Sequence, residues 1–216
     1  MEHRTAQRVA AIRPRVLITA AMVCIVLGIL VWHSRGPVAW ERPFIVLLRH
    51  EQLPLARPLI LLFQPIPFAM AIAGLAWRAA KSHRIRLAVT GTAGCVLAMI
   101  VTERVLKPLV DRHHQHWGSA VFPSGHVTAA AAWAMFAWLV FDPPPQLRIA
   151  FAAVPLMVGW AVVSTGAHYP ADAIAGLMVG GLVVYCVIAG VDRFVATTSG
   201  PPVLGLESEH RAPVRV

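Results

Sequence analysis

The chain has 216 residues, of which 57% are hydrophobic and only 13% charged, and its mean hydropathy is +0.65. Soluble domains carry about 25% charged residues. The composition therefore excludes an ordinary soluble domain, and the long apolar runs predict an integral membrane protein. The formal net charge is +9 at pH 7. Because most basic residues flank apolar runs, this charge predicts membrane orientation and contact with anionic lipid, with no nucleic-acid partner.

Six apolar segments each have about the 20 residues that a bilayer requires. The first follows a basic N-terminal stretch and has no small-x-small cleavage site after it, so we expect it to be retained as a membrane span. The segments cover residues 15–33, 58–77, 86–106, 125–141, 148–166 and 171–193. We predict an all-α fold, in which residues 1–196 form one bundle of six transmembrane helices. The tail, 197–216, has the Pro, Gly and charge content typical of disorder.

Basic residues predict the orientation of the bundle. The N-terminal segment holds four arginines, and Arg78, Lys81, Arg84 and Arg86 lie between the second and third spans, so both segments should face the cytoplasm. The loop over 34–57 is also basic, which an amphipathic stretch lying on the membrane would explain. The ends of spans three and five and the starts of spans four and six then share the extracytoplasmic face. Frequent Ala and Val, with Arg in preference to Lys, is typical of a GC-rich bacterial genome, so we expect a bacterial plasma membrane.

Two fixed positive charges, Lys107 and Arg112, follow the third span. Such side chains are charge-assisted donors for a phosphate group and for the charge that shifts in its transition state. The alternative is a pair of interfacial bases whose charged ends reach the lipid headgroups.

The fourth span opens with Pro123-Ser124-Gly125-His126. A helix N-terminus presents unpaired N–H groups and the positive end of the helix dipole, which suit an anion. Gly125 permits close approach of a ligand to the backbone, and Ser124 can cap the helix or bind a phosphoryl oxygen. An imidazole titrates near neutrality, so His126 is a candidate general acid. The alternative is a plain helix start with an interfacial histidine.

A similar start opens the sixth span, at His168-Tyr169-Pro170-Ala171-Asp172. Pro170 fits the first helical turn, where its missing N–H costs nothing. Asp172 can then reach back to His168, fix the tautomer of its ring and leave the other nitrogen free as a nucleophile. The alternative is a first-turn helix charge beside a loop histidine.

These residues resemble the type 2 phosphatidic acid phosphatase superfamily. The resemblance rests on Lys107, on the run Phe122-Pro123-Ser124-Gly125-His126, and on the run from His168 to Asp172 with Gly176. The family signature is Lys-x6-Arg-Pro, Pro-Ser-Gly-His and Ser-Arg-x5-His-x3-Asp. The second motif is complete here, and so is the His-x3-Asp half of the third. The resemblance covers spans three to six, and the family's six-span plan agrees with the spans predicted above.

The resemblance implies a mechanism and a set of roles. His168 would attack phosphorus to give a phosphohistidine, and Asp172 would orient it. His126 would protonate the leaving group and later help to activate water. No metal or other cofactor is expected in this family's phosphatases. The phosphoryl oxygens would be held by Lys107, Ser124 and the Gly125 amide.

The chain departs from the signature at both arginines. His114 and Gln115 stand where the first motif has Arg-Pro, and Ala161 and Val162 stand where the third has Ser-Arg. Losing such a charge-assisted donor costs about 2–4 kcal/mol of transition-state stabilisation. Arg112, five residues after Lys107, can replace the charge of the first arginine from a different position, and both Arg112 and His114 are included among the phosphate-binding candidates.

The function predicted is hydrolysis of a lipid phosphate or diphosphate, on a polyprenyl or glycerolipid tail, at the extracytoplasmic membrane surface. Two alternatives remain open. One is a non-catalytic or weakly active relative that binds anionic lipid headgroups. The other is a metal-binding membrane protein built on the histidines of the loop after span three, at positions 113, 114 and 116. Neither the exact lipid nor the oligomeric state follows from the sequence.

Overall fold

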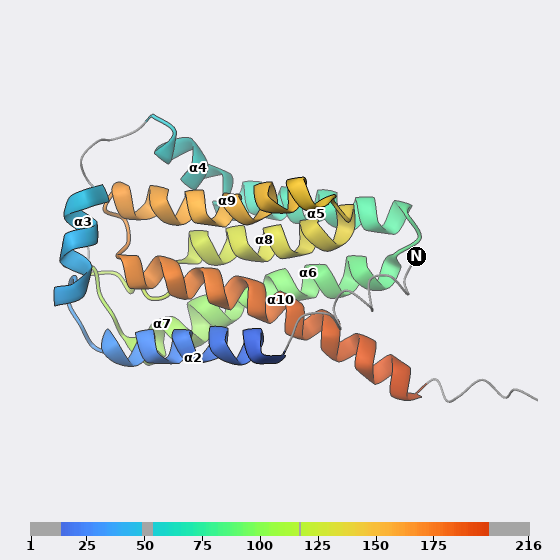
Figure 1. Ribbon diagram of the computed structural model, residues 1–216, viewed down its shortest axis with the longest axis horizontal. Coiled ribbons are helices and arrows are strands. Elements are labelled where there is room, and N and C mark those ends of the chain that lie inside the picture. The colour runs from blue at the N-terminus through green and yellow to red at the C-terminus, as the bar shows by residue number, and fades with distance from the viewer. Residues whose placement is uncertain (1–13, 49–53, 117, 199–216) are drawn as a thin grey trace, which may run out of the picture.

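The computed structural model describes residues 14–48, 54–116 and 118–198 (Figure 1). The described residues form helices and isolated bridges, with no strand among them, which confirms the predicted all-α fold. The long helices are α2 (Pro14–Leu30), α5 (Pro65–Lys81), α6 (Ile85–Ile100), α8 (Gly125–Phe141), α9 (Pro145–Ser164) and α10 (Pro170–Thr198). The short ones are the 3-10 helix η1 (Ala39–Glu41), α3 (Arg42–Leu48), α4 (Ala56–Leu62), the π-helix η2 (Val101–Leu106) and α7 (Lys107–Val110).

Each of the six predicted spans corresponds to an apolar helix or helix pair. Three helices are long and apolar enough to cross a membrane, over Ile85–Val110, Pro145–Ser164 and Pro170–Val195. A fourth span forms if α4 and α5, which are bent by 60° at the break between them, count as one. The remaining two are the 17-residue apolar helices α2 and α8. The structure is that of an integral membrane protein. Residues 1–13 and 199–216, which include most of the basic N-terminus and of the predicted tail, lie outside the described residues.

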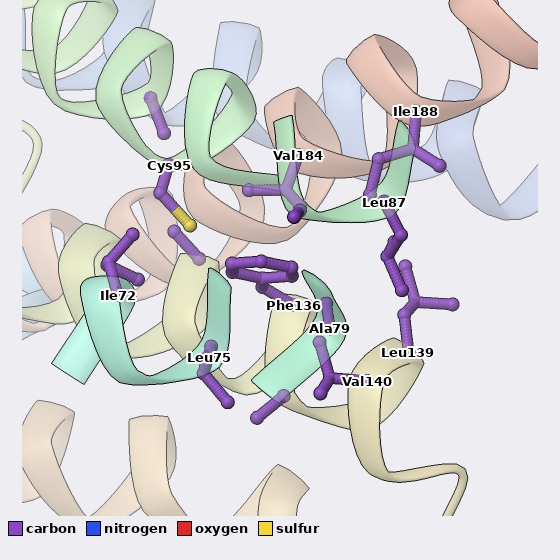
Figure 2. Close-up of a cluster of buried hydrophobic side chains, with 14 of the residues drawn as sticks. Ile72, Leu75, Ala79, Leu87, Cys95, Phe136, Leu139, Val140, Val184 and Ile188 are labelled. Carbon is purple, nitrogen blue, oxygen red and sulfur yellow. The ribbon is translucent and has the colours of Figure 1, made fainter. Parts of the chain in front are cut away.

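α8 is the central helix of the bundle (Figure 1). It is apolar on all sides, as expected of a helix surrounded by others, and most of its residues are buried. Phe136 of α8 fills the centre of a cluster with side chains from α5, α6 and α10 (Figure 2). Gly91 of α6 makes room for this ring, because a Cβ at Gly91 would lie 2.2 Å from it. This packing fixes the position of α8, and therefore of the motif at its start.

α10 contacts α8 along two glycines. A Cβ at Gly176 would lie 2.7 Å from the Ser124 carbonyl oxygen, and one at Gly180 would lie 2.3 Å from the Thr128 carbonyl oxygen. Real Cβ atoms do not approach so closely, so the two backbones can meet only because these positions lack a side chain. Small residues of this kind let membrane helices pack tightly. The contact brings the start of α10 beside the start of α8.

One end of the bundle gathers the segments that the sequence predicted to share a face. α7, the starts of α8 and α10 and the end of α9 all lie at this end, and α3 lies across it (Figure 1). The basic segment between α5 and α6 lies at the opposite end (Figure 1). There Arg84 donates hydrogen bonds to the carbonyl oxygens of Leu139 (2.7 Å) and Val140 (3.0 Å). These bonds pair carbonyl groups in the last turn of α8.

Candidate active site

His168 and Asp172 lie at the start of α10, as the sequence predicted. Pro170 is the first residue of this helix, so the chain turns sharply between the two side chains. Nδ1 of His168 is 3.6 Å from Oδ2 of Asp172 and, although buried, has no hydrogen-bond partner. The carboxylate is fully buried, and its Oδ2 accepts a hydrogen bond of 2.8 Å from the Tyr169 backbone N–H. Asp172 is thus held in place by its own helix turn, with one oxygen directed at the imidazole.

His126 lies beside His168, although the two residues are on different helices. Their ring centroids are 6.5 Å apart, with 67° between the ring planes. The two backbones are also joined here, because the Ser124 N–H donates a 3.0 Å hydrogen bond to the Asp172 carbonyl. The hydroxyl of Ser124 is buried without a hydrogen-bond partner and does not cap α8. The start of α8 therefore offers an unused hydroxyl and the free N–H groups of a helix N-terminus next to two imidazoles.

Lys107 follows the π-helix η2, and an acidic residue of η2 binds it. Its Nζ is 2.8 Å from both carboxylate oxygens of Glu103, four residues earlier. Glu103 also approaches Gly125, where a Cβ would lie 2.7 Å from its Oε1. Single turns of π-helix are frequently found at functional sites. The predicted phosphate-binding residues Lys107 and Gly125 thus lie together, with a carboxylate between them that the sequence analysis did not single out.

Arg112 contacts Asp172, as expected for a residue of the site, but other protein groups surround it. It is fully buried, and its Nη1 donates to Asp172 Oδ1 at 2.7 Å. The same guanidinium binds both carboxylate oxygens of Glu41 and stacks over the Tyr169 ring, 4.6 Å from its centroid. These groups surround the guanidinium. The geometry therefore favours a role for Arg112 in holding Asp172, and it does not favour the predicted contact between Arg112 and a phosphate.

His114 is likewise engaged inside the protein. It is buried, its Nε2 is 3.0 Å from the Gly166 carbonyl oxygen, and its ring stacks on Tyr169 with 6° between the planes. These contacts join the loop after α7 to the loop before α10. His114 therefore takes part in shaping the site, and its predicted phosphate contact stays a prediction.

Val162 stands where the sequence resemblance led us to expect an arginine. It is fully buried and packs in a cluster with Val127, Ala130 and Val158. An arginine at this position would have to displace apolar packing between α8 and α9, so no space is left for the missing charge.

Three residues at the site were missed by sequence reasoning. Gln64, at the break between α4 and α5, has its amide nitrogen 3.1 Å from Nε2 of His126. Glu103 gave a weak signal as an ionisable residue inside an apolar span. Glu41 was considered only as part of a basic loop, and its partner Arg112 lies 71 residues away, so no local pattern identifies it.

The loop histidines do not form a metal site in the part of the chain that the structure describes. No group of three or more His, Cys, Asp or Glu side chains there is arranged to hold a metal ion. His114 and His116 have ring centroids 5.7 Å apart, and Nδ1 of His113 is 3.1 Å from the Asp111 carbonyl oxygen.

Two curated proteins are similar to a part of this chain. A segment of this chain is 47% identical over 60 residues to a lipid A 1-phosphatase of Rhizobium etli, covering 28% of this chain and 25% of the relative. A lipid A 1-phosphatase of Rhizobium johnstonii is 46% identical over 59 residues, covering 27% and 23%. The match thus spans about a quarter of these relatives.

Among solved structures, a PAP2-type phosphatidylglycerolphosphate phosphatase from Bacillus subtilis superposes with a TM-score of 0.46 at 17% identity. The superposition covers 83% of this chain and 96% of the other. A family model, the PAP2 superfamily, matches residues 87–195. This range is just over half of the chain and contains both histidine motifs, so the chain belongs to the PAP2 superfamily.

Proposed function

We propose that this protein is a membrane phosphatase that removes phosphate from a lipid phosphate or diphosphate through a phosphohistidine. One observation carries the proposal: His126 and His168 lie side by side at one end of the bundle, with Asp172 behind His168. Two imidazoles at this separation can both reach one phosphoryl group. The family membership and the names of the two Rhizobium relatives support a lipid phosphate as the substrate.

The reaction would proceed in two halves. First, Nε2 of His168 forms a bond to phosphorus while the bond from phosphorus to the lipid oxygen breaks, and His126 donates a proton to that oxygen. Then His126 takes a proton from water, the water oxygen bonds to phosphorus, and the phosphorus–nitrogen bond breaks to release inorganic phosphate. Asp172 would hold the proton on Nδ1 of His168 through both halves.

The start of α8 and Lys107 would bind the phosphoryl group. The N–H groups of α8, the Ser124 hydroxyl and the Lys107 ammonium surround the same region. We place this site on the extracytoplasmic face, because the basic segment between α5 and α6 lies at the other end of the bundle (Figure 1). A lipid tail would stay in the bilayer while its headgroup reaches the helix ends. Metal ions are not needed for any step.

A second candidate, a weakly active relative that binds anionic headgroups, is favoured by the charges at the site. Val162 fills the position of one family arginine, Arg112 is buried among carboxylates, and Lys107 is already paired with Glu103. Few positive groups are therefore free to stabilise a phosphoryl transition state.

Phosphate release by the purified full-length chain in detergent tests both candidates. We expect release from a lipid monophosphate or a lipid diphosphate, with equal rates in the presence and absence of a chelator. His168→Asn should reduce the rate about 1,000-fold or more, because the nucleophile is lost. The matched control is His83→Asn, since His83 is exposed between α5 and α6 at a positive φ that Asn tolerates.

The outcomes separate the candidates. Full activity of His168→Asn would contradict the assigned nucleophile. Headgroup binding without turnover would favour the second candidate, and loss of activity with the chelator would contradict the metal-independent mechanism.

A further inference from the structure

Three ionic side chains from distant parts of the chain meet in the protein interior behind His168. They are Glu41, from the segment before α3, Arg112, from the loop after α7, and Asp172, from α10, and all three are fully buried. Arg112 lies between the two carboxylates. Its Nη1 donates to Asp172 Oδ1 at 2.7 Å and to Glu41 Oε1 at 3.1 Å, and its Nη2 donates to Glu41 Oε2.

Glu41 is held rigidly by the backbone around it. Its Oε2 accepts a hydrogen bond of 2.9 Å from the Val38 N–H, and its Oε1 accepts one of 3.0 Å from the Ala171 N–H. The second bond is made with the first turn of α10, one residue before Asp172. A carboxylate at a helix N-terminus also interacts favourably with the helix dipole. Glu41 therefore contacts both Arg112 and the helix that carries Asp172.

The segment that carries Glu41 is attached to the loop that carries Arg112. Nη2 of Arg112 donates to the Gly36 carbonyl at 3.2 Å, and the His113 N–H donates to the Ser34 carbonyl at 3.0 Å. These bonds fix the separation of Glu41 and Arg112. Residues 34–41 lie outside the range 87–195 that matches the family model, so the cluster depends on a part of the chain that the family signature does not include.

The charges of the cluster do not cancel. Two carboxylates and one guanidinium leave one net negative charge in a region without solvent exposure. Backbone N–H groups of Val38, Tyr169 and Ala171 donate to these carboxylates. The side-chain group beside them is Nδ1 of His168, which lies 3.6 Å from Asp172 Oδ2 and has no hydrogen-bond partner. An uncompensated buried charge is costly unless it has a function or a partner. A protonated Nδ1 on His168 would supply that partner.

We propose that Glu41 is a positioning residue that keeps Asp172 effective as the partner of His168. Arg112 orients the Asp172 carboxylate. Without Glu41, the positive charge of Arg112 would cancel the negative charge of that carboxylate. Glu41 offsets the charge of Arg112, so that Asp172 retains its negative charge toward the imidazole while the phosphorus–nitrogen bond forms and breaks. Glu41 is buried and acts only through Arg112 and Asp172. This inference rests on the proposed phosphohistidine mechanism.

Glu41→Gln tests the proposal, because it keeps the shape of the side chain and removes its charge. We expect kcat for release of phosphate from a lipid monophosphate to fall about 10- to 100-fold, by analogy with the loss of a residue that orients a metal ligand. KM should stay within about twofold, because the side chain does not touch substrate. Asp111→Asn is the matched control, since Asp111 is a half-exposed carboxylate at the same end of the bundle, paired with His33; it should leave kcat unchanged.

Two further variants distinguish an effect of charge from one of packing. In the Asp172→Asn background, Glu41→Gln should change the residual rate less than about twofold, because the effects of substituting two residues that act as a unit do not add. An equal loss in both backgrounds would overturn the inference. Glu41→Asp keeps the charge and should be more active than Glu41→Gln; the reverse order would show that packing alone matters and would also overturn it.

The controls separate this inference from the proposed function. An active wild type with a fully active Glu41→Gln variant would overturn only the role of Glu41. A wild type that releases no phosphate from any lipid phosphate would overturn the proposed function, and the inference with it. If Glu41→Gln does not give a monodisperse protein in detergent, Glu41→Asp decides: a kcat within about threefold of wild type at unchanged KM supports the inference, because the charge is kept, and a kcat reduced about 10-fold or more overturns it.

Discussion

At the scale of single residues, contacts were predictable where the two partners are close in the sequence. His168 and Asp172 are four residues apart, and Pro170 between them marks the helix start. Arg112 was identified as a site residue, but its partners could not be, because Glu41 and Asp172 lie 71 and 60 residues away. Contacts of this range depend on how the helices pack, and no pattern in the sequence records them.

Glu103 provides a test of electrostatics at the level of one residue. Its carboxylate lies 2.8 Å from Lys107 Nζ and would repel a phosphoryl group bound there. We expect Glu103→Gln to lower KM for a lipid monophosphate about three- to tenfold at low ionic strength, and the effect to shrink with added salt. Steady-state kinetics over a series of salt concentrations measures this.

The control for Glu103 is again Asp111→Asn, which removes a negative charge at the same end from a carboxylate that pairs with His33. It should leave KM unchanged. If Glu103→Gln raised KM instead, the carboxylate would be holding Lys107 in position for the substrate, and the repulsion argument would be wrong.

Helix starts were the elements that the sequence predicted best. α8 begins at Gly125 and α10 at Pro170, as the Ser-Gly and His-x-Pro patterns indicated. Apolar length also predicted α9 and α10 well. The π-helix η2 and the sharp bend between α4 and α5 were not predicted. Both depend on packing against neighbouring helices, which local propensity does not contain.

The contact between α8 and α10 can be tested with two glycines of the same helix. Gly180→Ala would place a Cβ 2.3 Å from the Thr128 carbonyl oxygen and so force the helices apart. Overpacking of this kind costs about 1–3 kcal/mol, so we expect a lower Tm in detergent and reduced turnover. Gly190→Ala is the control, because a Cβ at Gly190 meets nothing within 4 Å.

An alanine at Gly190 should be neutral or stabilising by up to about 1 kcal/mol, because Ala is the better helix former. Equal Tm values for the two variants would contradict the proposed close approach of α8 and α10 at the active site.

At the scale of the whole molecule, hydropathy predicted six apolar spans, and the structure has six corresponding helical units. The topology also predicted that residues spread from 107 to 172 would meet at one end, and they do (Figure 1). The charge pattern predicted which end faces the cytoplasm, and this orientation stays a prediction. The contacts of residues 34–41 with Arg112 and with the start of α10 were not predicted, because that segment carries no motif.

The most direct test of the central claim, that two imidazoles at this end act on one phosphorus atom, is to trap the phosphorylated enzyme. The full-length protein is mixed with a lipid phosphate carrying labelled phosphorus and quenched in alkaline denaturant, and the labelled peptide is identified. We predict acid-labile label on His168 in the wild type and none in His168→Asn. Label on another residue, or turnover by a wild type that never acquires label, would contradict the account.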